Sequence, residues 1–271
     1  MGISRLSTLV LTVVVAVMAS GCAQMVITGA ADVNKEAFGA KKKFAVASIA
    51  SLKTFHGEQG LAQVFKNNDA IPGANTQPLI NKLHPKIIQA LGSSRNITLI
   101  PEAMVFASSG YKNATEDPRL IKVLFMSQEI NVANNYKYIS DAQKFAQLAR
   151  DLNVDGVIGV MVTFSVSSGG GAFNISGLSF GKKSYSATAT VSAIAYNANG
   201  DVIWKDSTTK EAEPGDTKAI VVLDTTGFTD TAFMKLHPSA VEIGGKAVDV
   251  LLARFDDTMA GKTVDRIQRV K

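Results

Sequence analysis

The chain has 271 residues, of which 46% are hydrophobic and 19% are charged, and its formal net charge is +5. This length is sufficient for a packed core in one large domain or two small ones. The charge is too small to indicate nucleic-acid binding, although it suits an anionic lipid surface or an acidic polysaccharide. With a single cysteine the chain has no intramolecular disulfide, so its stability has to come from the core.

The amino terminus has the pattern of an export signal. Arg5 precedes an apolar run over residues 6–20 that is short for a bilayer span and ends in small residues, which predicts a signal peptide over residues 1–21. The segment Ala19-Ser-Gly21-Cys22 resembles a bacterial lipobox. The resemblance implies cleavage after Gly21, a diacylglycerol thioether on Cys22 and an N-acyl chain such as palmitate on the new terminus. The alternative is an ordinary signal peptide followed by an incidental cysteine.

The segment after the signal predicts a tether and then a buried strand. Residues 22–42 show no sustained period, so we expect them to link the lipid to the domain and to end near a solvated basic triplet at residues 41–43. Residues 44–50 are almost entirely apolar and predict a strand that is buried on both faces. A helix over residues 76–92 follows, because apolar residues recur at the spacing of one helical face. Residues 96–100 predict a second strand.

The middle of the chain predicts two helices and a third strand. Asp117-Pro118 opens a short helix over residues 119–127. A longer helix begins with a capping box from Ser140 to Gln143 and has Leu148 on its apolar face. Residues 154–166 form the most apolar segment after the signal and predict the third strand.

The last part of the chain predicts a hairpin and a closing helix. Residues 184–196 and 202–209 flank an Asn-Gly turn, and the Ser and Thr residues of the first strand alternate with apolar ones, which indicates one hydrated face. The last helix is expected over residues 238–255, where Gly244-Gly245 loosens the helix or allows close approach to the sheet. Residues 261–271 form a basic tail.

These elements predict one periplasmic α/β (α+β) domain over residues 43–260. Their order is β-α-β-α-β-β-β-α. Parallel crossovers followed by an antiparallel hairpin give a mixed β-sheet with helices packed on it.

Three segments behind the lipobox carry a resemblance to known proteins. They are residues 44–49, residues 146–159 and the hairpin segment over residues 193–204. These segments resemble the periplasmic lipoproteins related to the curli secretion channel CsgG, to the amino-terminal domain of TolB and to PelC. The resemblance covers roughly residues 43–257 and consists of short sequence motifs typical of the fold, not of active-site signatures. It implies a non-enzymatic protein that forms rings or scaffolds at the outer membrane and assists secretion or envelope assembly.

No residue pattern typical of catalysis or metal binding stands out. His56, His84 and His237 have no second histidine or carboxylate at ligand spacing, and a Gly-x-Ser-x-Gly elbow is lacking. Gly261-Lys-Thr resembles the end of a phosphate-binding loop, but Asp256 stands where the first glycine is required. The sequence therefore predicts no catalytic residue, no metal ligand and no cofactor besides the lipid on Cys22. A periplasmic enzyme is the less favoured alternative.

The connection between the third strand and the hairpin contains an apolar cluster. If Ser176-Gly177 forms a two-residue turn, four apolar residues share one face of a small hairpin: Phe173, Ile175, Leu178 and Phe180. They either cover the core or form a contact surface for a neighbouring subunit or the bilayer. In the channel relatives the same connection supplies membrane strands, but the alternation that such strands need fails across residues 169–171.

These observations predict an outer-membrane-anchored periplasmic lipoprotein that is a structural or scaffold subunit of a secretion or cell-envelope assembly complex. Ala23 stands where an Asp would suggest inner-membrane retention. The expected partners are the membrane, further copies of the chain and other envelope or secretion proteins, without nucleic acid. The alternative within this class is a subunit of a ring-forming, CsgG-like secretion channel.

Overall fold

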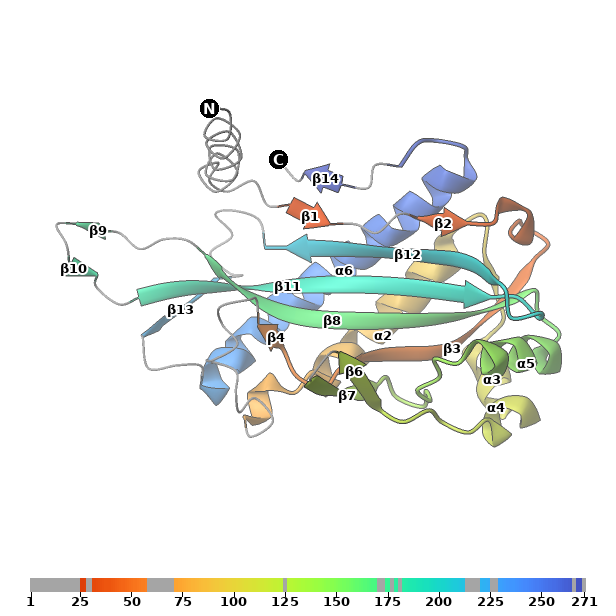
Figure 1. Cartoon of the computed structure of the whole chain (residues 1–271), viewed down its shortest axis with the longest axis horizontal. Coiled ribbons are helices and arrows are strands. Elements are labelled where there is room, and N and C mark those ends of the chain that lie inside the picture. Colours follow the sequence, from red (N-terminus) through yellow and green to blue (C-terminus); the bar gives the residue numbers. More distant parts are fainter. Residues whose placement is uncertain are drawn as a thin grey trace, which may run out of the picture.

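A mixed sheet with helices on both faces forms the centre of the domain (Figure 1). The computed structural model describes residues 25–27, 31–57, 71–123, 126–169, 174–175, 178–179, 182–212, 220–224, 229–264 and 267–269. Ten of the described strands belong to the sheet: β2 (Asp32–Val33), β3 (Lys43–Leu52), β4 (His56–Gly57), β5 (Thr98–Leu99), β6 (Leu120–Val123), β7 (Met126–Val132), β8 (Gly156–Gly169), β11 (Lys182–Tyr196), β12 (Val202–Glu211) and β13 (Ile220–Asp224). The main order is β2-β12-β11-β8-β3-β7-β6, and β13, β4 and β5 pair with β11, β8 and β3 respectively. The pairs β3–β8, β3–β5 and β4–β8 are parallel, whereas the others are antiparallel.

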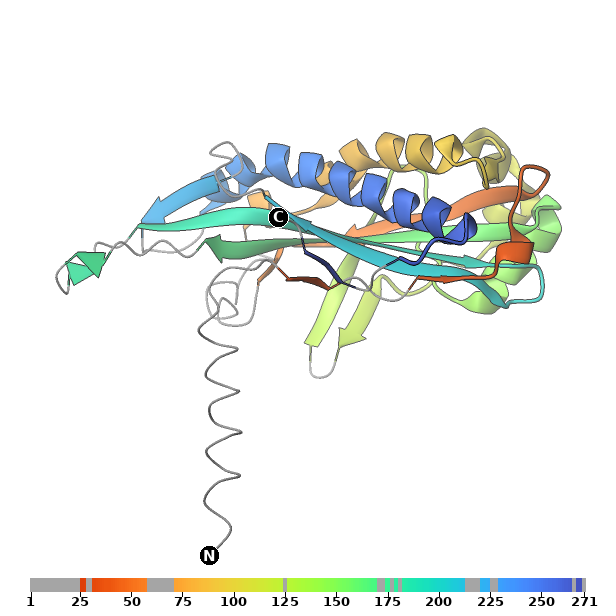
Figure 2. The ribbon, with the colours of Figure 1, turned by 90° about the horizontal axis from the view of Figure 1, so that it is seen from above.

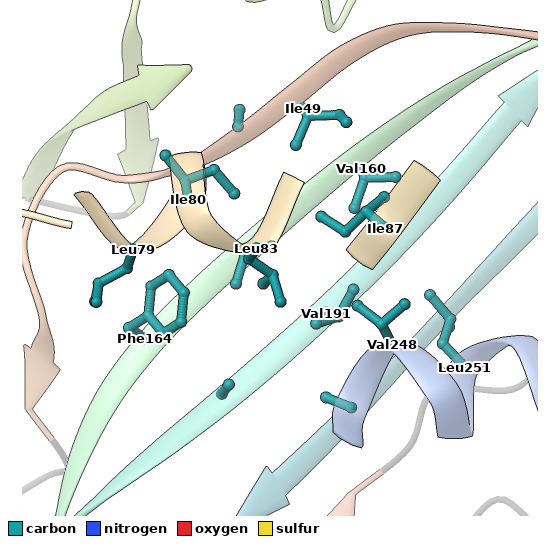
Figure 3. Packing of buried hydrophobic residues seen from close by; sticks show 14 of the residues in the cluster. Ile49, Leu79, Ile80, Leu83, Ile87, Val160, Phe164, Val191, Val248 and Leu251 are labelled. Atoms are coloured by element: carbon teal, nitrogen blue, oxygen red, sulfur yellow. The ribbon is translucent and has the colours of Figure 1, made fainter. Parts of the chain in front are cut away.

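Two long helices, α2 (Gln77–Ser93) and α6 (Asp230–Met259), cover one face of this sheet (Figure 2). In the core, Leu83 of α2 and Val248 of α6 lie among apolar residues of the sheet such as Val160 (Figure 3). A Cβ atom on Gly244 would lie 3.0 Å from Cδ2 of Leu83 and 3.5 Å from Cε1 of Phe164. Glycine at this position therefore allows the close approach of α6 to both α2 and the sheet, as the sequence predicts.

Three further helices lie at one end of the sheet (Figure 1). They are α3 (Glu102–Ala107), α4 (Ser109–Asn113) and α5 (Ala142–Leu152). Phe145 and Leu148 of α5 are buried in a second cluster with Ala45 and Val157 of the sheet. The amphipathic face predicted for this helix is therefore its buried face.

The predicted class, a mixed α/β sheet with packed helices, is confirmed, but the exact element order is not. The strands predicted over residues 44–50 and 154–166 are β3 and β8, and the predicted hairpin is β11–β12. At the turn, Gly200 has a φ of +90°, and the side chain of Asn197 accepts hydrogen bonds from the N–H groups of Asn199 and Asp201. Local sequence chemistry thus determines this turn.

The tether prediction does not hold for residues 31–42. β2 pairs with β12, the N–H of Asn34 donates to the carbonyl of Ile203 at 2.9 Å, and a 3₁₀ helix spans Lys35–Ala37. The ring of Phe38 is buried, with its centroid 4.9 Å from those of both Phe44 and Phe255. This segment lacks a period because its few apolar residues are separately inserted into a core that other elements build.

The helix predicted over residues 119–127 is wrong, because this region forms the antiparallel pair β6–β7. Ile130 and Val132 are buried and alternate with polar residues, and Val132 pairs with Ala50 of β3. An available sheet edge decides the conformation here, and it outweighs the turn signal of Asp117-Pro118.

Two helix starts also differ from the prediction. Asp141, and not Ser140, caps α5, since its Oδ1 accepts from the N–H groups of Gln143 and Lys144 at 2.9 and 3.0 Å. α6 begins at Asp230, where Thr229 is the cap, eight residues before the start predicted at Pro238. The proline is tolerated inside the helix, and the buried residues of the extra turns include Ala232, Phe233 and Leu236.

Candidate interaction site on the open face of the sheet

A hollow of about 570 Å³ lies on the sheet, beside the start of α5. Met161 of β8 and Ile194 of β11 are half-buried, and with Ala50 of β3 they give it an apolar lining. Gly159 borders the hollow, and its lack of a side chain lets the ring of Phe145 lie directly on the sheet. A Cβ atom there would lie 2.9 Å from Cζ of Phe145, whose ring stacks on Tyr196 at a centroid distance of 5.2 Å.

A bulge in β3 places a polar group in the same hollow. The pairing of β3 with β8 shifts register between Val46 and Ser48, which directs Ser48 to the side where Gly159 lies. The hydroxyl of Ser48 accepts a hydrogen bond from the N–H of Ile139 at 3.3 Å. The bulge therefore fixes the segment that leads into α5 against the sheet.

Hydroxyl pairs continue the surface along β8, β11 and β12. Ser192 lies 2.8 Å from Ser207, both at the hollow, and Thr190 and Thr209 form a second pair at 2.8 Å. A third pair joins Ser167 of β8 to a hydroxyl of β11 at 3.0 Å. The hydrated face predicted for β11 is thus present, but each of these hydroxyls is paired within the sheet. These paired hydroxyl groups are uncharged and suit contact more than chemistry.

Three charged residues line the hollow: Asp32, Lys205 and Asp206. Asp32 and Lys205 stand opposite each other in the pairing of β12 with β2 and are exposed, whereas Asp206 is buried and its carboxylate accepts hydrogen bonds from Arg254. The two exposed charges, one of each sign, give the rim no strong preference for an anion or a cation.

The predicted hairpin is present at the far end of the sheet (Figure 1). β9 (Asn174–Ile175) pairs with β10 (Leu178–Ser179), and Ile175 stands opposite Leu178, as the two-residue turn predicts. Phe173 and Phe180 lie outside the described residues. β8 and β11 carry the hairpin and pair with each other as far as Gly169 and Ser184.

The three histidines occupy three separate places. His84 of α2 contacts Glu102 of α3, with its Nε2 2.6 Å from Oε1, and the hydroxyl of Tyr136 donates to the same oxygen at 2.7 Å. Burial raises the pKa of Tyr136, and its hydrogen bond to Glu102 raises it further, so the phenol stays protonated. The cluster joins α2, α3 and the segment before α5, and spacing along the chain did not reveal it.

The other two histidines have individual partners. His237 is buried, and its Nε2 lies 2.7 Å from the carbonyl oxygen of Gly73, which joins α6 to the 3₁₀ helix Pro72–Ala74. His56 is exposed, and its Nδ1 lies 3.0 Å from Nε2 of Gln128. Each of these two contacts can be explained by a structural role of the histidine.

A carboxylate anchors the start of α5. Asp117 accepts hydrogen bonds from the N–H groups of Ser140 and Asp141, and the ammonium group of Lys144 pairs with it. Burial raises the pKa of the Asp117 carboxyl, but the hydrogen bonds from Lys144 and Ser140 outweigh it, so the pKa lies below its usual value. The ionised carboxylate therefore stabilises the wall of the hollow.

Within the described ranges, no three histidine, cysteine or acidic residues lie close enough together to bind a metal ion. None of the described helices has the length and apolar character required to cross a membrane. Gly21 and Cys22, the predicted cleavage and lipidation residues, lie outside the described residues. Neither a model of a known protein family nor a curated protein matches the chain. The resemblance to the CsgG-related lipoproteins therefore stays a prediction from the sequence.

The hollow is not among the features predicted from the sequence, although the sequence contains a signal for it. Along β11 the hydrated positions are occupied by Ser and Thr until Ile194, and the paired positions of β8 include Met161. An apolar residue at a hydrated position of a strand marks an interruption of that face. The periodicity of β11 does not reveal that Gly159 of β8 and Phe145 of α5 lie beside Ile194.

Proposed function

We propose that the protein is a periplasmic lipoprotein, anchored in the outer membrane through Cys22, and a scaffold subunit of a secretion or envelope-assembly complex. The observation that carries this proposal is the β9–β10 hairpin, which lies beyond the long helices at the end of β8 and β11 (Figure 2). A hairpin of two-residue strands is not stable alone in water, so its position depends on the strands that carry it. An apolar pair at such a tip suits a contact with another subunit.

The open face supports the same proposal. Its hollow joins an apolar floor to paired hydroxyls, which is the composition of a contact surface with an apolar centre and a polar rim. The partner that this surface fits best is a further copy of the chain or another envelope protein. The histidine contacts described above favour structural roles over a periplasmic enzyme.

The hairpin provides the decisive test. The double variant Ile175→Ser/Leu178→Ser, and separately Phe173→Ser/Phe180→Ser, should lower the native mass of detergent-extracted protein while the melting temperature stays nearly unchanged. The matched control is Met104→Ser/Met234→Ser, since these residues are exposed apolar side chains on α3 and α6 (58% and 53% exposed). An unchanged native mass in both hairpin variants would contradict the proposed contact, and unfolding would place the four residues in the core.

The same preparation separates the alternatives. A scaffold subunit leaves planar bilayers closed to ions, whereas a ring-forming channel conducts and loses conductance in the hairpin variants. An enzyme would instead lose its cellular role on removal of a histidine side chain from a folded, correctly located protein. His56→Ala suits that test best because His56 is exposed, unlike the buried His237.

A further inference from the structure

We propose that the hollow on the open face of the sheet binds a small neutral amphiphile, a molecule with one apolar chain and an uncharged head that carries oxygen atoms. A monoacylglycerol of medium chain length is an example of this class. The inference goes beyond the proposed scaffold function, because it concerns a small ligand instead of a protein partner. It depends on neither the acylation of Cys22 nor the hairpin.

The size of the hollow suits a molecule with a single chain. Its volume of about 570 Å³ lies within the range of small-molecule pockets, roughly 300–1,000 Å³. A phospholipid with two long chains is too large for such a space. The ligand class is therefore limited to molecules with one chain of medium length.

The lining offers an apolar surface to this chain. Met161 of β8 and Ile194 of β11 are half-buried, and Ala50 of β3 and Phe145 of α5 complete this part of the lining. The unbranched side chain of Met161 adapts readily to the shape of a ligand. A chain that covers these residues removes apolar surface from water, which is the main driving force for binding.

A buried hydroxyl at the hollow has a proton to donate. Ser48 is 3% exposed and lines the hollow. Its oxygen accepts the N–H of Ile139, and within the described part of the chain no acceptor lies in reach of its own proton. Leaving a hydroxyl proton without an acceptor in apolar surroundings is unfavourable. An ester or hydroxyl oxygen of the ligand supplies this acceptor.

Two phenols add donors at the same place. Tyr138 and Tyr196 line the hollow and are half-buried, and no residue among those described forms a hydrogen bond with either phenol hydroxyl. Burial raises the pKa of Tyr196, and the charge of Asp141 raises it further, so its phenol stays protonated. Together with Ser48, these groups favour a head that carries oxygen acceptors.

The charges around the hollow favour a neutral head. Asp32 and Lys205 are exposed on the rim, and the buried Asp206 is paired with Arg254. A charged head meets attraction from one rim residue and repulsion from the other, and it loses part of its hydration. A neutral head avoids this cost.

Isothermal titration calorimetry with 1-decanoylglycerol tests the site. The protein used is the chain from Cys22 onward, which contains every described residue and needs no detergent without its lipid. Below the concentration at which the ligand aggregates, we expect one molecule to bind per chain. Decanoate should bind about tenfold more weakly, because its head is charged, and glycerol should not bind. Equal affinities for 1-decanoylglycerol and decanoate would overturn the assignment of a neutral head.

Matched variants locate the binding in the hollow. Met161→Trp fills the hollow and should abolish binding. Ser165→Trp places the same ring on the same face of β8 but outside the hollow, and it should leave binding unchanged. Ser48→Ala removes the buried donor and should weaken the binding of 1-decanoylglycerol by about fivefold. An unchanged melting temperature shows that each variant is folded.

The ligand proposal and the proposed function fail separately. Absence of binding to the wild-type chain, or equal binding by Met161→Trp and Ser165→Trp, would overturn the ligand proposal. If Met161→Trp instead lowers the native mass of detergent-extracted protein and the wild type binds no ligand, the hollow is a contact between subunits. Neither result changes the tests of the lipid anchor and the hairpin.

Discussion

Removal of the guanidinium group of Arg254 tests how firmly α6 is attached to the sheet. Nε and Nη2 of Arg254 donate to the two carboxylate oxygens of Asp206 at 3.0 and 3.1 Å. The two side chains are 2% and 0% exposed. The N–H of Ser207 adds a further hydrogen bond to Asp206. The variant Arg254→Met keeps much of the side-chain volume and leaves a buried carboxylate without its cation.

The expected cost is large because water does not replace the missing cation. Breaking a buried pair on one side typically costs about 3–5 kcal/mol. For a chain of this size such a loss lowers the melting temperature by roughly 10 °C. Urea unfolding of the chain from Cys22 onward, followed by the fluorescence of the buried Trp204, measures the free energy directly. Replacing both partners, as in Asp206→Leu/Arg254→Met, should recover most of the loss, since no charge then stays buried.

An exposed pair between α2 and α6 provides the control. Nζ of Lys86 lies 2.7 Å from Oδ1 of Asp249, and these side chains are 39% and 57% exposed. Lys86→Met should cost less than about 1 kcal/mol, because solvent screens such pairs. If Arg254→Met costs no more than Lys86→Met, the reasoning from burial is refuted and α6 does not hold Asp206 away from water.

Three further predictions concern the anchor and α5. Cys22→Ser removes the thiolate that accepts the lipid, so mass spectrometry should find no lipid on the variant, and lipid-free wild-type protein would exclude the anchor. Leu148→Asp places a charge at a position where the side chain is only 1% exposed, so it should destabilise the domain by several kcal/mol. The control Gln147→Asp, at an exposed position of the same helix, should cost about 1 kcal/mol or less. Equal costs would show that the face of α5 that carries Leu148 is exposed. Asp117 has a lowered pKa, so its stabilisation is complete above the pKa of the unfolded chain, near 4, and disappears as the pH falls through the lower folded value. Asp117→Asn should therefore lower stability at pH 7 but have little effect near pH 2, and a pH-independent difference would contradict this role.

Local periodicity was sufficient for the elements that carry their own pattern. The buried face of α5, the apolar strands β3 and β8 and the Asn-Gly turn of β11–β12 follow from the spacing of residues that are neighbours in the chain. The class of fold follows from these elements, because each has an apolar face that only packing against the others can bury.

Tertiary structure alone decided the elements that depend on distant partners. Residues 31–38 have no period of their own, and they are ordered because Phe38 fits between Phe44 and Phe255. β7 forms along the edge of β3, and β1 (Met25–Ile27) acquires its place from β14 (Ile267–Arg269), more than 200 residues further along the chain.

The candidate site also depends on contacts between residues that are far apart in the sequence. The wall of the hollow forms where the ring of Phe145 packs on Gly159, and the cluster of His84, Glu102 and Tyr136 requires three segments to meet. A sequence reports the preferences of each segment over one or two turns or strands. The spaces and contacts between segments depend on how several packed elements share one core, and that arrangement exists only in the folded chain.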